Sequence, residues 1–182
     1  FQDIETTKKK IKDRAEKSRI SYSHILSDED GVGGGVVDGL KGSKGFIGNS
    51  SPLDIWDSLR AKTVRANFTN LRSQCYFKLG ETVNEHKIAI DLRYFESNIE
   101  GYTREKAISD LEEELDHIKR IDNSGQNTKL AIIPKELMKE ELGRSPDYAD
   151  ILMMRMLYEL KNIPTNFPIA VNTIIRKPNP AR

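Results

Sequence analysis

The sequence has little of what holds small secreted proteins together, because its 182 residues include a single cysteine, Cys75. One cysteine excludes a disulfide framework and a cysteine-rich zinc site, and it fits a reducing compartment. No apolar run approaches the roughly 18–20 residues that a membrane span needs, so no membrane is expected. With 29 Lys and Arg against 28 Asp and Glu, the net charge of +1 argues against nucleic-acid binding by bulk charge alone.

The spacing of apolar residues predicts a chain of the α/β class. Helices are expected at residues 4–19, 36–40, 67–84, 103–121, 135–142 and 145–160. Strands are expected at residues 20–26, 45–48, 87–90 and 129–133. Residues 49–66 carry few periodic apolar residues and are expected to form a long surface loop. We expect one domain over residues 1–160 and an irregular, proline-containing tail over residues 161–182.

The first cluster of acids, Asp28-Glu29-Asp30, ends a predicted strand and precedes the glycine-rich residues 31–35. A strand, a glycine loop and a short helix are typical of a βα unit, and ligands gather at the carboxyl ends of parallel strands. The ordinary alternative is a polar turn in which glycine permits positive φ. The spacing matches neither a dinucleotide fingerprint nor a phosphate-binding loop followed by Lys-Ser/Thr.

The second cluster lies in the opening turn of the predicted last helix, where Ser145-Pro146 is expected to start the helix. Asp147 and Asp150 are three residues apart and share a helix face. Capping and dipole compensation explain Asp147, but Asp150 lies among Ile151 and the methionines and is expected to point inward. A buried carboxylate is costly unless a cation or a hydrogen-bond donor meets it.

If the strand end and the helix start come together, three or four carboxylates converge, among them Asp28, Asp147 and Asp150. All-oxygen ligands favour Mg²⁺ or Mn²⁺, and two such ions can hydrolyse a phosphodiester. Ion pairs between these acids and lysine or arginine would argue against that interpretation. An alternative with different chemistry is a phosphoribosyltransferase-like or nucleotide-binding enzyme that uses the acidic and glycine-rich residues 28–36.

Two segments in this order carry a family resemblance: "ILSDEDGVGGGVVDGL" at residues 25–40 and "LGRSPDYADILMM" at residues 142–154. The sequences "NFTNLRSQCYFKL" at 67–79 and "KIAI" at 87–90 lie between them. Over roughly residues 20–160 the chain resembles the nuclease domain of phage large terminase subunits, which package DNA. The resemblance implies an RNase H-like fold, a mixed central sheet flanked by helices, around a two-metal site.

The same resemblance implies roles for individual residues. Asp28 matches the family's strand-end metal ligand, Asp147 and Asp150 match its helix acids, and Asp30 and Asp38 would be supporting. An endonuclease of this family cleaves concatemeric duplex DNA in the host cytoplasm, and the full motor meets a small terminase subunit and a portal protein. The family's first acidic ligand lies on a strand for which this chain has no match, so we expect the domain to lack its first strand and the ATPase. A catalytically incomplete fragment that binds DNA or a partner is therefore the third alternative.

Contacts with DNA are expected to be contacts with phosphates, because packaging needs little sequence readout. The basic residues that cluster in sequence around the predicted loop are Lys41, Lys44, Arg60, Lys62, Arg65 and Arg72. Trp56 is interpreted as an anchor for that loop, and Cys75 as a core residue of its helix.

Overall fold

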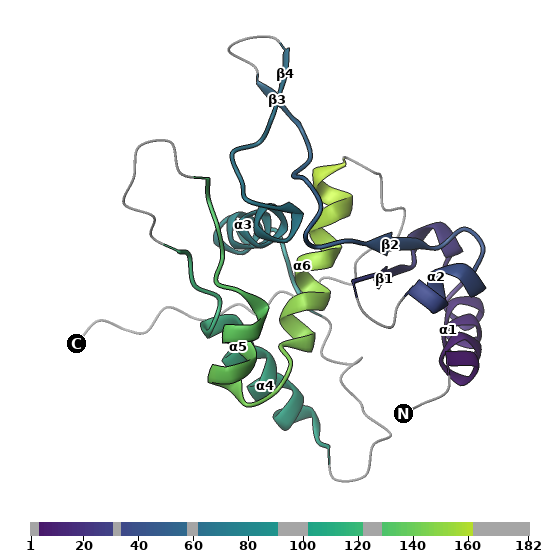
Figure 1. Cartoon of the computed structure of the whole chain (residues 1–182). Helices are drawn as coiled ribbons and strands as arrows, with labels where there is room; N and C mark the ends of the chain where they lie inside the picture. The colour runs from purple at the N-terminus through teal and green to yellow at the C-terminus, as the bar shows by residue number, and fades with distance from the viewer. Residues whose placement is uncertain (1–3, 31–33, 58–61, 91–101, 122–128, 162–182) are drawn as a thin grey trace.

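The computed structural model describes residues 4–30, 34–57, 62–90, 102–121 and 129–161 (Figure 1). Two helices, α3 (Leu71–Asn84) and α6 (Asp147–Leu160), pack against each other at the centre of the molecule. Their facing side chains form most of the hydrophobic core, which consists of Phe46, Leu71, Cys75, Tyr76, Leu79, Ala149, Met153, Met156 and Leu157. Cys75 is fully buried there, as the helical spacing predicts.

Local sequence explains where the central helices begin. Asn70 caps α3, because its side chain accepts a hydrogen bond from the backbone N–H of Ser73 at 2.9 Å. Ser145 was expected to cap α6, but the capping position is occupied by Pro146, whose side chain cannot accept a hydrogen bond. The prediction that Ser145 caps this helix is therefore wrong.

Two shorter helices lie beside this pair. Helix α4 (Arg104–Asp116) is capped by Thr103 and packs on α6, and α5 (Lys135–Leu142) follows Pro134. Helix α5 ends at Gly143, whose φ of 68° is a left-handed conformation that glycine adopts without steric cost. Four residues connect α5 to α6, so the end of α5 lies close to the start of α6 (Figure 1).

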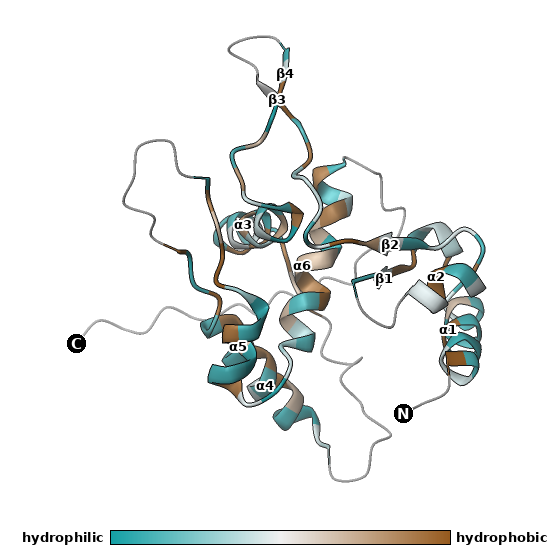
Figure 2. Ribbon diagram, in the orientation of Figure 1, coloured by the Kyte–Doolittle hydropathy of each residue, from teal (hydrophilic) through white to brown (hydrophobic). Residues whose placement is uncertain are grey.

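The sheet that positions the first acidic cluster is small. Strand β1 (Leu26–Asp28) pairs in parallel with β2 (Lys44–Phe46), and α2 (Gly34–Gly39) lies between them in the chain. In this register Asp28 lies opposite Phe46, whose side chain is buried in the core. The predicted parallel βα unit is therefore confirmed. Helix α1 (Ile4–Lys17) packs on α2, and its exposed surface is mostly polar (Figure 2).

Several predicted strands are wrong. They are short apolar runs, for which the sequence does not show whether a neighbouring strand is present to pair with them. Residues 22–24 form a 3₁₀ turn, η1 (Tyr22–His24), before β1 begins at Leu26. Residues 87–90 form no strand, and residues 129–133 make only isolated bridges, Phe68 with Leu130 and Arg120 with Ile132. Periodicity cannot decide such short runs, because a strand also needs a neighbour to pair with.

The predicted long loop is also wrong, because residues 49–66 contain an antiparallel hairpin. Strand β3 (Ile55–Asp57) pairs with β4 (Lys62–Val64), with Ile55 opposite Val64. The hairpin projects from the body of the molecule (Figure 1). The fold class remains α/β, with the described strands forming two separate two-stranded sheets, one parallel and one antiparallel, beside the central helices. Residues 162–182 of the predicted tail lie outside the described residues. No helix in the described ranges is long and apolar enough to span a bilayer.

Candidate functional site

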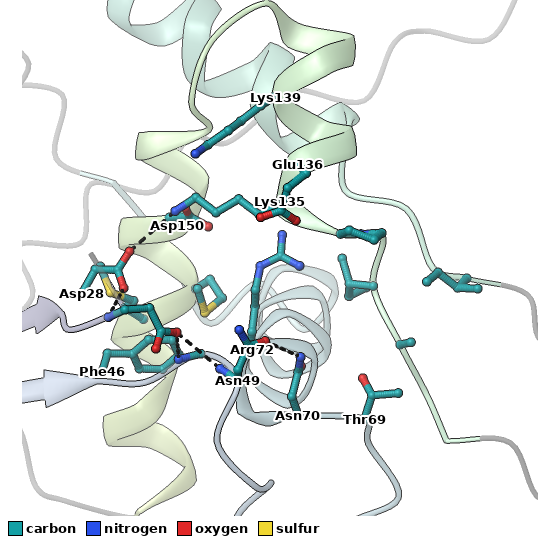
Figure 3. A pocket seen from close by; sticks show the side chains of 18 residues that line it. Asp28, Phe46, Asn49, Thr69, Asn70, Arg72, Lys135, Glu136, Lys139 and Asp150 are labelled. Carbon is teal, nitrogen blue, oxygen red and sulfur yellow. Dashed lines mark hydrogen bonds and ion pairs between the residues drawn. The ribbon is translucent and has the colours of Figure 1, made fainter. Parts of the chain in front are cut away.

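A polar cavity of about 650 Å³ lies where β1, the connection from β2 to α3, and helices α5 and α6 meet (Figure 3). Both predicted clusters of acids contribute to its wall. The charged residues that line it are Asp28, Asp30, Glu136, Asp150, Arg72, Lys135 and Lys139. Neutral polar groups come from the chain before α3: Asn49, Thr69 and Asn70.

Asp28 and Asp150 face each other across one cationic group. Asp28 is the last residue of β1, and Asp150 lies one turn into α6. The Nζ atom of Lys135 lies 2.5 Å from Oδ2 of Asp150 and 3.6 Å from Oδ2 of Asp28. Two carboxylates that are 122 positions apart in the sequence therefore converge on one point in the cavity.

Asp150 is only 6% exposed, and a carboxylate buried to this extent requires a charged or hydrogen-bonding partner. Lys135 is that partner. Burial lowers the pKa of Lys135, but the hydrogen bond and the negative charge of Asp150, together with Asp28, outweigh this and raise it above its ordinary value. The ammonium group is therefore charged at neutral pH. Sequence reasoning missed Lys135, because nothing near residue 135 signals that it lies opposite two distant acids.

A second donor orients Asp150 from the core side. The hydroxyl of Tyr76, on α3, donates to Oδ1 of Asp150 at 2.8 Å. Burial first, and then the charge of Asp150, raise the pKa of Tyr76 well above its usual value, so the hydroxyl keeps its proton. Arg72 lies 4.9 Å from the centre of the Tyr76 ring. Asp150 thus has one oxygen fixed by Tyr76 and the other directed toward Lys135.

The neighbouring acid Asp30 has a structural contact. Its Oδ2 accepts hydrogen bonds from the backbone N–H groups of Gly48, at 2.7 Å, and Asn49, at 3.4 Å. These bonds join the turn after β1 to the segment after β2 and fix one edge of the cavity. The expected supporting role of Asp30 is consistent with this geometry, and Asp38 is an exposed residue of α2 that does not line the cavity.

A buried ion pair holds the start of α6. The carboxylate of Glu114, on α4, accepts a hydrogen bond from the backbone N–H of Ala149 at 2.8 Å. Glu114 is fully buried and forms an ion pair with Arg144, which also contacts Glu113 at 3.0 Å. Glu114 therefore satisfies a free N–H group in the first turn of α6, next to Asp150. Neither residue was singled out from the sequence.

The structure does not bring Asp147 to the other two acids. Asp147 is the first residue of α6, is exposed, and does not line the cavity. Residues three apart on a helix differ by about 60° in direction, and here only Asp150 faces inward. Within the described ranges, no three Asp, Glu, His or Cys side chains are arranged to hold one metal ion. The predicted convergence of three or four carboxylates is thus reduced to two.

Two carboxylates still fit a hard divalent cation. Mg²⁺ in enzymes is commonly bound by one or two carboxylates, with water and substrate phosphate as the other ligands. The oxygens of Asp28 and Asp150 already surround one positive charge, and the polar cavity leaves room beside them. The expectation was that ion pairs of these acids with lysine count against a metal, and Lys135 forms such ion pairs with both acids, so a metal that binds there has to displace the ammonium group or bind beside it.

The predicted DNA-binding residues do not form one group. Arg72 lines the cavity, where its guanidinium donates to the carbonyl of Ile133 at 2.9 Å. The ammonium of Lys44 lies 5.2 Å from the centre of the Tyr158 ring. Lys41, Lys62 and Arg65 are exposed, on the α2–β2 connection and along the hairpin. Arg60 and the side chain of Trp56 lie outside the described residues.

Comparison with solved structures finds a likeness to a phage protein. The nuclease domain of the large terminase subunit gp2 of bacterial virus Sf6 is 31% identical, with a TM-score of 0.55 over 79% of this chain and 68% of that one. A lysine-to-alanine mutant of that domain with manganese is 31% identical, with a TM-score of 0.55 over 79% and 69% of the two chains. The corresponding mutant with calcium is 30% identical, with a TM-score of 0.54 over 79% and 68%. No protein-family model and no curated protein sequence matches the chain.

Proposed function

This chain belongs to the nuclease domains of phage large terminase subunits, and from that membership we propose that it is a metal-dependent endonuclease that cleaves concatemeric duplex DNA during genome packaging. The observation that carries the proposal is the convergence of Asp28 and Asp150 on one cation position. Its fold is the RNase H-like fold of that family.

We propose that Asp28 and Asp150 hold Mg²⁺ or Mn²⁺. A divalent cation bound there would supply a Lewis acid that polarises the scissile phosphate and makes water a stronger nucleophile. The contribution of the protein is positional: β1 presents Asp28, the core presents Asp150, and Tyr76 fixes which oxygen of Asp150 faces the cavity. A second cation, as the two-metal interpretation requires, would take most of its ligands from the DNA phosphate and water.

The DNA is proposed to approach along the exposed basic residues Lys41, Lys62 and Arg65. We propose the same contact with DNA phosphates for Lys44, Arg60 and Arg72. The guanidinium of Arg72 also donates a hydrogen bond to a backbone carbonyl. In the full-length motor the partners proposed are the small terminase subunit and the portal protein, in the host cytoplasm. The domain proposed to carry these functions is residues 1–160.

The direct test is metal-dependent cleavage of plasmid DNA. We expect the purified protein to convert supercoiled plasmid to nicked and linear forms with Mn²⁺ or Mg²⁺, and to do so no longer once EDTA removes the metal. Agarose gels measure the three DNA forms over time. Absence of cleavage with either metal, while DNA binding persists, would support the catalytically incomplete fragment instead and contradict the proposal.

The ion pair with Lys135 predicts a change in metal affinity. A cation that binds Asp28 and Asp150 must compete with, or be repelled by, the Lys135 ammonium, which lies between them. We expect Lys135→Ala to bind Mn²⁺ about tenfold more tightly than the unchanged protein, because one like charge is removed at close range. Isothermal titration calorimetry measures this affinity.

A matched control for that titration is Lys119→Ala, which removes an equal charge from an exposed ion pair with Glu141. Its Mn²⁺ affinity should match that of the unchanged protein. If Lys135→Ala leaves the Mn²⁺ affinity unchanged, the metal does not bind where the lysine now lies.

A further inference from the structure

Lys139 lies one helical turn after Lys135 and lines the same cavity. Both lysines extend from α5 toward the cavity in Figure 3. Residues four apart on a helix lie on one face, so α5 contributes two ammonium groups to the cavity wall, along with the carboxylate of Glu136. The facing wall, from β1 and α6, presents the carboxylates of Asp28 and Asp150.

The two lysines differ in their partners. The charge of Lys135 is balanced by Asp150 and Asp28. Lys139 is exposed, and no described residue forms an ion pair with it, including Glu136, which lies three residues before it. Like charges four residues apart on a helix repel each other, and among the described residues none forms an ion pair with Lys139, although Glu136 lines the same cavity.

The size of the cavity limits which anion it takes. A volume of about 650 Å³ is in the range of small-ligand sites, roughly 300–1,000 Å³, and is too small for a whole duplex. It suits a short segment of one DNA strand, whose phosphates carry single negative charges. Lysine binds phosphate as a compact point charge and needs no fixed planar geometry, which fits an exposed and flexible side chain.

We propose that Lys139 binds a backbone phosphate of the DNA strand whose scissile bond lies at Asp28 and Asp150. This inference rests on the proposed nuclease function, and it adds the residue that holds the strand beside the reacting phosphate. Asp28 and Asp150 lie on one side of the bound segment, and Lys139 contacts the strand from the α5 side, one helical turn beyond Lys135.

The experiment compares DNA binding by the unchanged protein, Lys139→Ala and Lys12→Ala. Lys12 is an exposed lysine of α1 that does not line the cavity, so its variant removes the same net charge elsewhere. Fluorescence anisotropy with a short labelled duplex, in Ca²⁺ and over about 50 to 200 mM salt, gives the affinity and its salt dependence. Binding is thus measured separately from cleavage, and thermal melting checks that each variant is folded.

We expect Lys139→Ala to bind DNA roughly five- to tenfold more weakly near 0.1 M salt, with a salt slope smaller by about one unit. In the Mn²⁺ cleavage assay its KM should rise more than its kcat falls. Lys12→Ala should match the unchanged protein in both assays.

Any of four results would overturn the proposal. Equal losses of affinity in Lys139→Ala and Lys12→Ala would show a net-charge effect only. Unchanged DNA binding by Lys139→Ala, with weaker binding of a mononucleotide, would assign Lys139 to a nucleotide site. If the unchanged protein cleaves DNA and Lys139→Ala binds it equally well, this inference fails while the nuclease function stands; if the unchanged protein neither binds nor cleaves DNA, both fail.

Discussion

Replacement of Asp150 by Asn is expected to lower Mn²⁺-dependent plasmid cleavage on the order of 100- to 1,000-fold, because several kcal/mol of metal assistance depend on this carboxylate. Asparagine keeps the size of the side chain and an oxygen for the Tyr76 hydroxyl, but it loses the negative charge that faces Lys135. Initial cleavage rates with equal protein, measured under saturating Mn²⁺, test this expectation.

Asp147→Asn is the matched control for Asp150→Asn. Both residues lie in the first turn of α6 and both were predicted metal ligands, but only Asp150 faces the cavity. We expect Asp147→Asn to keep cleavage within about threefold of the unchanged protein, since an exposed charge at a helix start contributes only about 0.3–1 kcal/mol. Asp28→Asn should behave like Asp150→Asn. Cleavage lost in Asp147→Asn and kept in Asp150→Asn would reverse the assignment of the metal ligand.

Replacement of Arg144 by Ala is expected to lower the free energy of unfolding by about 3 kcal/mol, which corresponds to a fall in Tm of about 6–12 °C for a chain of this size. The reason is the charge that remains, because Glu114 is fully buried and would lose its ion-pair partner. Arg144 itself is 31% exposed, which places the effect at the lower end of the range for buried ion pairs. Thermal and urea unfolding followed by circular dichroism measure the change.

Two controls separate a buried charge from a lost surface contact. Lys119→Ala breaks an exposed ion pair with Glu141 and should cost no more than about 1 kcal/mol. The double variant Arg144→Ala/Glu114→Gln should be more stable than Arg144→Ala, because a neutral amide oxygen still accepts the N–H of Ala149. A double variant no more stable than the single one would show that Arg144 stabilises the fold through its other contacts, such as the ion pairs with Asp110 and Glu113, rather than by pairing with Glu114.

These two predictions concern connected parts of one site. Glu114 holds the backbone of Ala149, and the next residue along α6 is Asp150. The ion pair with Arg144 therefore joins α4 to the turn of α6 that carries the proposed metal ligand. Loss of stability and loss of activity can be distinguished, because Asp150→Asn leaves this ion pair in place.

Long periodic segments were predictable from the sequence. Apolar spacing predicts a helix over residues 67–84, which the structure confirms over 71–84, because a long amphipathic face must be buried whatever its neighbours are. The helices expected over 135–142 and 145–160 are present over 135–142 and 147–160. The same reasoning placed Cys75 in the core and turned Asp150 inward among methionines. Asp28 at the end of a parallel strand also followed from local order, since an acid before glycines commonly ends a strand.

The sequence by itself determined where the helices lie to within a few residues at each end, that Asp28 ends a strand, and which family the motifs resemble. Only the tertiary structure decided that Asp150 rather than Asp147 faces Asp28, that Lys135 lies between them, and that Glu114 supports the start of α6. It also decided that residues 55–64 contain a hairpin. The physical reason is the distance along the sequence between the residues in contact. The periodicity of apolar residues depends on neighbours within one or two helical turns. The contacts named here join separate segments and form only when the core brings those segments together.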